Sequence, residues 1–152
     1  MNSNNTKVAL LVGGLGTRLR SVLPSSPKVL ASVGNGSFLN LLLRQIRNQG
    51  LTRIVMCTGY MADQVENAYG NGDSWELAIE YSRESQPMGT AGALKLAAPL
   101  LQDSPFCIVM NGDSFLEIDL ESLLNFHRAQ RGPITVAVVR VPNTSRYGTV
   151  VV

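Results

Sequence analysis

The sequence predicts an α/β protein, folded as a three-layer α/β/α sandwich around a mixed, mainly parallel β-sheet. Short apolar runs of strand length alternate with longer segments of helical periodicity along most of the chain. Several of these runs are apolar at every position, which is typical of parallel strands buried on both faces. The 152 residues, 45% hydrophobic and 16% charged, can build one core, and we expect a single domain over residues 1–152.

The first predicted strand is Lys7–Val12, a continuous apolar run that two glycines close. A loop rich in Gly, Ser and Pro follows, and Ser37 has a side chain suited to cap a helix. The helix that it opens ends before Gly50 and carries a broad apolar face. This face consists of Phe38, Leu39, Leu41, Leu42, Leu43 and Ile46.

The middle of the chain repeats this order. Arg53–Thr58 is predicted as a second buried strand, and a short helix that ends at Gly70 follows it. The helix is indicated by the spacing of Ala62, Val65 and Tyr69. Glu76–Ser82 alternates between apolar and polar residues, so we expect a half-buried strand. Its apolar face carries Leu77, Ile79 and Tyr81.

The last third begins with a helix that Thr90 is expected to open. This helix is expected to fray or end near Pro99, because proline cannot donate the helical hydrogen bond. Its apolar positions are Leu94, Ala97, Ala98 and Leu101. The very apolar segment Phe106–Met110 is the next predicted strand.

Asp119 is then expected to cap a helix that ends before Gly132. One side of this helix carries Leu120, Leu123, Leu124 and His127. Further strands are predicted over Ile134–Val141 and over Tyr147–Val152.

Hydropathy and cysteine content exclude several classes of protein. No apolar run approaches the ~18 residues that a transmembrane helix needs, and no signal peptide is recognisable. Cys57 and Cys107 both lie in apolar runs, so we expect two buried thiols in a reducing compartment. Two cysteines are too few for a disulfide framework or a zinc site. We therefore expect a cytoplasmic protein with no membrane partner.

The net charge of +2 conceals an uneven distribution. The first 62 residues contain seven basic side chains and no acidic one, whereas residues 63–152 contain six basic and eleven acidic ones. A segment without carboxylates is suited to an anionic ligand. A solvated basic face explains the same composition equally well. The few aromatic residues are not interleaved with the basic ones, so we expect no nucleic-acid partner.

The first candidate binding motif follows the first strand and runs from Gly13 to Arg18. Glycines after a buried strand let backbone N–H groups approach phosphate oxygens. Arg18 and Lys28 add two cations that suit a polyphosphate. The third glycine and the ribose-binding acid of the dinucleotide fingerprint are missing, which disfavours a dinucleotide-dependent oxidoreductase. A tight exit from the strand explains the glycines alone about as well.

Two further motifs are expected at the same edge of the sheet, because such folds bind ligands beyond the carboxyl ends of their strands. Asn111-Gly112-Asp113 follows an apolar strand, and one carboxylate beside phosphates is typical of Mg²⁺ sites. The segment from Gln86 to Gly92 surrounds a predicted helix start, where Gln86 can read a base edge. Taken singly, Asp113 is also explained as a turn residue and Thr90 as a helix cap.

The remaining polar residues are expected to be structural. His127 has no serine or cysteine spaced to form a catalytic triad with it. Glu117, Asp119 and Glu121 are expected to be charges of a turn and a helix start.

In combination, these motifs resemble the sugar nucleotidyltransferase family, the NDP-sugar pyrophosphorylases, from Lys7 to Val152. The family pattern G-G-x-G-T-R-L…P-K is matched by Gly13, Gly14, Gly16, Thr17, Arg18, Leu19, Pro27 and Lys28. The P-x-G-T-A-G stretch is matched by Pro87, Gly89, Thr90, Ala91 and Gly92. The N-G-D motif is matched by Asn111, Gly112 and Asp113, and the later Y-G by Tyr147 and Gly148. The detail is most similar to the D-glycero-D-manno-heptose 1-phosphate guanylyltransferase branch.

The resemblance implies the Rossmann-like nucleotide-diphospho-sugar transferase fold. It also implies nucleotidyl transfer from an NTP, here GTP, to a sugar 1-phosphate, here D-glycero-D-manno-heptose 1-phosphate, for lipopolysaccharide or capsule synthesis. The implied nucleotide-binding positions are Gly13, Gly14, Gly16, Thr17, Gln86, Gly89 and Thr90. The implied catalytic residues are Arg18 and Lys28 on the phosphates and Asp113 on Mg²⁺. Gly112 and Gly148 are implied to approach the sugar.

The chain departs from the family pattern in two ways. Val29 follows Lys28 where the family has a second proline, and the family's downstream glutamate–lysine pair and second metal-binding aspartate have no counterpart before Val152. We therefore expect the nucleotide-binding part of a C-terminally incomplete domain. Transfer to mannose 1-phosphate or another sugar 1-phosphate stays an alternative, as does nucleotide binding without catalysis. The base, the sugar and a homo-oligomeric state stay open.

Overall fold

The computed structural model describes residues 5–14, 26–145, 148 and 150 of the chain. The chain divides into two compact units, residues 1–116 and residues 117–152. The strands among the described residues are β1 (Lys7–Leu11), β2 (Ser32–Val33), β3 (Gly36–Ser37), β4 (Arg53–Thr58), β5 (Ala78–Arg83) and β6 (Cys107–Asn111). The helices are α1 (Phe38–Asn48), α2 (Ala62–Tyr69), α3 (Gly89–Leu101) and α4 (Leu120–Gln130), with 3₁₀ turns η3 (Lys28–Leu30) and η4 (Asp73–Trp75).

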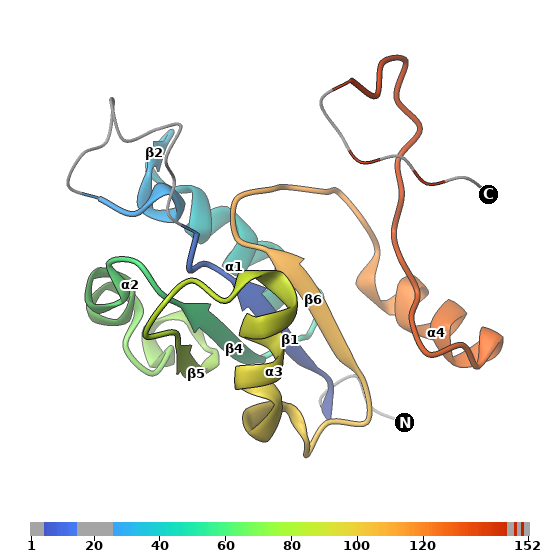
Figure 1. The fold of residues 1–152 in the computed structure, drawn as a ribbon, viewed down its shortest axis with the longest axis horizontal. Helices are drawn as coiled ribbons and strands as arrows, with labels where there is room; N and C mark the ends of the chain where they lie inside the picture. Colours follow the sequence, from blue (N-terminus) through green and yellow to red (C-terminus); the bar gives the residue numbers. More distant parts are fainter. Residues whose placement is uncertain (1–4, 15–25, 146–147, 149, 151–152) are drawn as a thin grey trace. The chain divides into compact units, whose positions relative to one another are not determined.

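The first unit is built on a four-stranded sheet whose order is β5-β4-β1-β6 (Figure 1). All three pairings in this sheet are parallel, and Lys7 lies opposite Arg53 on one side and Cys107 on the other. The described residues add one antiparallel pair, β2 with β3, in a separate ribbon. The chain runs from β1 outward to β4 and β5 and then crosses to β6 on the other side of β1. The order therefore reverses between β1 and β6, where open α/β sheets bind their ligands.

Helices cover both faces of this sheet, which confirms the predicted α/β architecture. Figure 1 shows α3 in front of the strands and α1 behind them. Ala93 and Ala97 of α3 pack on Val55 and Cys57, the residues of β4 that face one side. Ile54 and Met56 alternate with these two residues and are also fully buried. The α1 residues that are fully buried are Leu39, Leu42, Leu43 and Ile46.

The local signals for helix ends are confirmed for α1 and α2. The Ser37 side chain accepts a hydrogen bond from the Asn40 N–H, so it caps α1 as predicted. Gly50 follows α1 with φ +75°, a conformation that glycine adopts without strain, and Gly70 ends α2. Leu41 was expected on the apolar face but is exposed, because it lies about 200° around the helix from Leu39.

Several element boundaries in the first unit differ from the prediction, and the starts of β5 and α3 differ for clear local reasons. The fifth strand begins at Ala78 rather than Glu76, because Glu76 has φ +55° and ends the η4 turn. Thr90 does not cap α3, since Gly89 is already helical and Met88 occupies the capping position. The helix continues two residues beyond Pro99, to Leu101.

Cys107 is exposed, whereas Cys57 is buried as expected. The apolar run around Cys107 predicted burial on both faces, but β6 is an edge strand among the described residues. Burial raises the pKa of the Cys57 thiol to about 11, and partial desolvation of the Cys107 thiol raises its pKa as well, although the residue as a whole is exposed.

The second unit contains α4, which Asp119 caps by accepting the Ser122 N–H, as predicted. Leu120 and Leu124 are buried, and Arg131 ends the helix with φ +52° just before Gly132. The predicted strand at Ile134–Val141 is wrong for the structure as described, because no ladder forms there and its apolar side chains are exposed. The predicted strand Tyr147–Val152 falls largely outside the described residues. No helix in the described part of the chain is long and apolar enough to cross a membrane.

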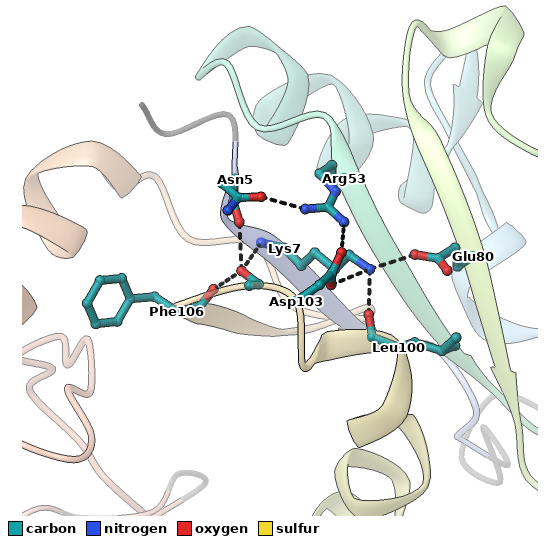
Figure 2. A network of polar contacts seen from close by, with 8 residues as sticks. Asn5, Lys7, Arg53, Glu80, Leu100, Asp103 and Phe106 are labelled. Atoms are coloured by element: carbon teal, nitrogen blue, oxygen red, sulfur yellow. Dashed lines mark hydrogen bonds and ion pairs between the residues drawn. The ribbon is translucent and has the colours of Figure 1, made fainter. Parts of the chain in front are cut away.

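A polar network fixes the amino edge of the sheet (Figure 2). The Lys7 side chain is only 5% exposed, and its ammonium pairs with Glu80 at 2.8 Å and with Asp103 at 2.9 Å. It also donates to the Leu100 carbonyl in the last turn of α3, where a cation is favoured by the helix dipole. Asp103 pairs with Arg53 of β4 as well. The network therefore joins three strands to α3 at the edge opposite the switch point.

Candidate functional site

The candidate site lies at the carboxyl edge of the sheet, where four parallel strands end together. β1 is followed by Val12, Gly13 and Gly14, and β4 by Gly59. β5 leads into Glu84 and β6 into Gly112. The predicted motifs after β1 and β6 are therefore on adjacent strands, and the end of β4 lies on the other side of β1.

Gly13 and Gly59 are glycines because their backbones touch. A Cβ atom on Gly13 would lie 3.0 Å from the Gly59 nitrogen, and a Cβ atom on Gly59 would lie 3.0 Å from the Gly13 carbonyl oxygen. Backbone packing alone therefore explains why residue 13 is a glycine, and no bound ligand is needed to explain it. Gly14 is different, because it is exposed and a Cβ atom there would meet no described residue within 4 Å. Of the two, Gly14 is the one whose backbone is open to a ligand.

Gly112 holds the end of β6 against the end of β1. Its N–H donates to the Leu11 carbonyl at 2.8 Å. A Cβ atom at this position would lie 2.6 Å from Val12 Cγ1 and 2.7 Å from the Leu11 oxygen. Only glycine fits this approach, and the tight packing sets the place from which Asp113 projects at the switch point.

Lys28 and Asp113, 85 residues apart in the sequence, form an ion pair at this point. The Lys28 Nζ lies 2.7 Å from Asp113 Oδ2, and the two side chains are 38% and 45% exposed. Ser114 Oγ donates to the other carboxylate oxygen at 3.3 Å. The hydrogen bond from Lys28 holds the pKa of Asp113 below its usual value, so the carboxylate is ionised at neutral pH.

Val29 anchors the segment that carries Lys28. Its side chain is buried, and its Cγ1 would lie 3.3 Å from a Cβ atom on Gly112. The η3 turn around it is closed by hydrogen bonds from Leu30 to the Pro27 carbonyl and from Ala31 to the Lys28 carbonyl. Val29, which stands where the family pattern has a second proline, therefore packs an apolar side chain against Gly112, the residue before Asp113.

The start of α3 supplies the third predicted motif. Gln86, Gly89 and Thr90 are all exposed, and Gly89 has φ +69° with no atom of the described part of the chain within 4 Å of a Cβ position. Met88, at the capping position, provides no side-chain hydrogen bond to the first turn. The Met88 side chain therefore does not cap the first amides of α3. Thr90, the predicted cap, lies within the first turn of the helix instead.

The ionised carboxylate of Asp113 can bind a divalent cation if phosphates and waters complete the coordination of that cation. The Lys28 ammonium already places a positive charge on this carboxylate. Mg²⁺ takes one or two carboxylates together with phosphates and waters, which one ionised aspartate satisfies on the protein side. Among the described residues, no group of three or more His, Cys, Asp or Glu side chains could hold a metal by itself.

Several predicted residues are not placed by the structure. Gly16, Thr17 and Arg18 lie outside the described residues. Gly148 belongs to the second unit and is exposed. The residues that the structure brings to one edge of the sheet are Gly13, Gly14, Lys28, Gly112 and Asp113.

Glu84 is a polar residue of this edge that the sequence did not single out. Its Oε2 would lie 3.3 Å from a Cβ atom on Gly59, and its N–H donates to the Thr58 carbonyl. Its position could have indicated it, because Glu84 directly follows a strand at the carboxyl edge of the sheet. A carboxylate accepts hydrogen bonds and repels phosphates, so Glu84 suits the N–H donors of a ligand.

The model of the Nucleotidyl transferase family matches residues 7–152. A D-glycero-alpha-D-manno-heptose 1-phosphate guanylyltransferase of Aneurinibacillus thermoaerophilus is 34% identical over 142 residues, which are 93% of this chain and 61% of the relative. A mannose-1-phosphate guanylyltransferase of Mycobacterium tuberculosis is 35% identical over 150 residues, 99% of this chain and 42% of the relative.

A solved structure shares the fold. The crystal structure of HddC from Yersinia pseudotuberculosis complexed with GMP-PN superimposes with a TM-score of 0.71 at 33% sequence identity. The match covers 80% of this chain and 53% of that one. The chain therefore spans about half the length of the proteins to which it is similar.

Proposed function

Because the chain belongs to the nucleotidyl transferase family, we propose that it transfers a nucleotidyl group from GTP to a sugar 1-phosphate. D-glycero-D-manno-heptose 1-phosphate is the first candidate acceptor and mannose 1-phosphate the second. Relatives named for these two activities, at 34% and 35% identity, support this choice. The products are an NDP-sugar and pyrophosphate.

The observation that carries the proposal is the meeting of Lys28 and Asp113 at the switch point of the sheet, on the edge that also carries the exposed Gly14. A cation for phosphate, a carboxylate for a divalent metal and an exposed backbone segment are the groups that a nucleotide–metal complex needs. Their convergence from segments 85 residues apart is not required by packing, because both charged side chains are about half exposed.

In the proposed reaction, an oxygen of the sugar phosphate attacks the α-phosphorus of GTP in line. The new P–O bond forms as the bond to the leaving pyrophosphate breaks, so no protein nucleophile takes part. The chain positions the reactants and stabilises the developing charge. In this proposal Lys28 and Arg18 would contact the phosphates, and Gly14 would offer its backbone. Bound at Asp113, Mg²⁺ would supply further neutralisation of phosphate charge.

The first test measures binding and transfer separately. We expect calorimetry to detect binding of GTP with Mg²⁺, and a pyrophosphate-release assay to detect turnover when either sugar 1-phosphate is added. Arg18→Ala should lower turnover by about 10³-fold, the size typical of one preorganised charge contact. An Arg18→Ala variant with normal turnover would contradict the role of Arg18, and a chain that binds no NTP would contradict the proposed function.

A second candidate function is nucleotide binding without transfer. The described groups at the carboxyl edge, a cation, a carboxylate and an exposed backbone segment, are those that binding of a nucleotide with its metal needs by itself. Binding of GTP with Mg²⁺ and no release of pyrophosphate with either acceptor would support this function instead.

A further inference from the structure

The Lys28–Asp113 ion pair occupies both groups that the proposed function requires. Lys28 Nζ contacts Asp113 Oδ2 at 2.7 Å, and Ser114 holds the other carboxylate oxygen. If Lys28 is to contact a phosphate and Asp113 a divalent cation, the two side chains cannot stay in this contact. An ammonium and a divalent cation on the same oxygen would repel each other.

We propose that Lys28 is a placeholder for the divalent cation, so that nucleotide and cation replace the ion pair together. Lys28 moves from the carboxylate to the phosphates, and the cation takes its place on Asp113. This inference rests on the proposed function and adds to it a coupling between the two ligands.

The coupling follows from the charges. A nucleotide that draws Lys28 away without a cation leaves the Asp113 carboxylate unpaired beside negative phosphates. A cation that displaces Lys28 without a nucleotide leaves the ammonium without its anion. Each ligand therefore removes the cost that the other would meet alone, and by linkage each tightens binding of the other by the same factor.

The surroundings suit an exchange of side chains over a fixed backbone. Both charged groups are about half exposed, and exposed ion pairs are weak enough to break. Beneath them, Val29 is buried and Gly112 is packed against Val12 and Leu11, so the backbone positions are held. The exchange thus needs rotation of side chains only.

The main experiment is a double-mutant cycle on nucleotide binding without metal. The dissociation constant of a non-hydrolysable GTP analogue is measured by calorimetry in EDTA for the unmodified chain, Asp113→Asn, Lys28→Met and the double variant. Asp113→Asn removes the repulsion between this carboxylate and the phosphates, so it tightens binding of the analogue whether or not Lys28 is present. When Lys28 is present, the substitution also breaks the ion pair and frees the ammonium for the phosphates. We expect its gain to be about fivefold larger with Lys28 present than in the Lys28→Met background, from the usual strength of an exposed pair.

A gain that is equal in both backgrounds, or larger in the Lys28→Met background, would overturn the exchange. The control is the Arg47–Glu76 ion pair, which is also exposed and lies beside the start of β5, at the amino edge of the sheet. Arg47→Met and Glu76→Gln should leave the dissociation constant unchanged. If the unmodified chain binds no analogue even with Mg²⁺, the proposed function itself has failed.

A second measurement tests the cation side and uses one variant. Mn²⁺ binding in the absence of nucleotide is followed by electron paramagnetic resonance. Lys28→Met should bind Mn²⁺ about fivefold more tightly than the unmodified chain, because the ammonium no longer competes. Equal affinity of the two proteins for Mn²⁺ would contradict the placeholder role of Lys28. Because this measurement does not use the Asp113 variant, it stands even if that variant does not fold.

Discussion

At the scale of single residues, the binding edge depends on glycines that act through the absence of a side chain. Gly13 and Gly59 let two loop backbones touch, and Gly112 lets β6 close on β1. Gly14 has no such contact with any residue that the structure describes. The sequence motif treats Gly13 and Gly14 alike, whereas the structure assigns one to packing and leaves the other open to a ligand.

Gly112→Ala should destabilise the fold, because the new methyl group would overlap Val12 Cγ1 and the Leu11 oxygen. Overpacking of this kind costs about 1–3 kcal/mol. Urea unfolding followed by circular dichroism measures the change. Gly14→Ala is the matched control and should stay within about 0.5 kcal/mol of the unmodified chain. Equal stability of the two variants would show that the close approach of β1 and β6 is not maintained in solution.

The candidate site was predictable at the residue scale only in part. The motifs pointed to Lys28 as a cation for phosphates and to Asp113 as a carboxylate for Mg²⁺ directly after a buried strand. That these two side chains contact each other depends on β6 pairing with β1, which no local pattern specifies. Glu84 was missed because the predicted strand ended at Ser82, whereas β5 continues to Arg83 and Glu84 follows it directly.

At the scale of elements, local signals predicted best where they act through neighbouring residues. β4 has the predicted bounds, and Ser37 and Asp119 cap their helices through amides three residues away. The predicted strand Ile134–Val141 was wrong for the opposite reason. β-branched residues favour extended backbone, but a strand also needs a partner, which the described part of the chain does not supply.

Ser37→Ala should cost about 1–2 kcal/mol of stability, because the hydroxyl caps α1. The same oxygen is hydrogen-bonded to the Tyr69 hydroxyl at 2.8 Å, which joins α1 to α2. Thermal unfolding of this variant is compared with that of Thr90→Ala. Because Thr90 does not cap α3, its replacement should change stability by less than about 0.5 kcal/mol. A larger loss for Thr90→Ala than for Ser37→Ala would reverse the two assignments.

At the scale of the whole molecule, the first unit has a distinct charge arrangement at each edge of its sheet. The amino edge is closed by the Lys7 network, in which a buried ammonium meets two carboxylates and a helix end. The carboxyl edge carries a half-exposed pair at the switch point. The first arrangement is suited to stability and the second to exchange with ligands.

The Lys7 network predicts a loss of stability in acid. Hydrogen bonds from Lys7 and then Arg53 lower the pKa of Asp103 to about 2, so its contribution is complete above the usual pKa near 4 and is lost as pH falls through about 2. Urea midpoints at pH 7, 4 and 2.5 should therefore fall for the unmodified chain between the last two values. Asp103→Asn should be less stable at pH 7 and lose less in that window, although other carboxylates still titrate. If the urea midpoints of the two proteins fall equally between pH 4 and pH 2.5, protonation of Asp103 does not cause the loss of stability.

We propose that the carboxyl edge of the sheet binds a nucleotide together with a divalent cation. Hydrogen–deuterium exchange with a non-hydrolysable GTP analogue and Mg²⁺ tests it most directly, because it reports on both edges in one measurement. We predict that protection increases in the peptides that contain Gly14, Lys28, Gly89 and Asp113. Peptides around Lys7 and Asp103, at the amino edge, should be unchanged. Protection confined to the amino edge, or absent at saturating ligand, would contradict the claim.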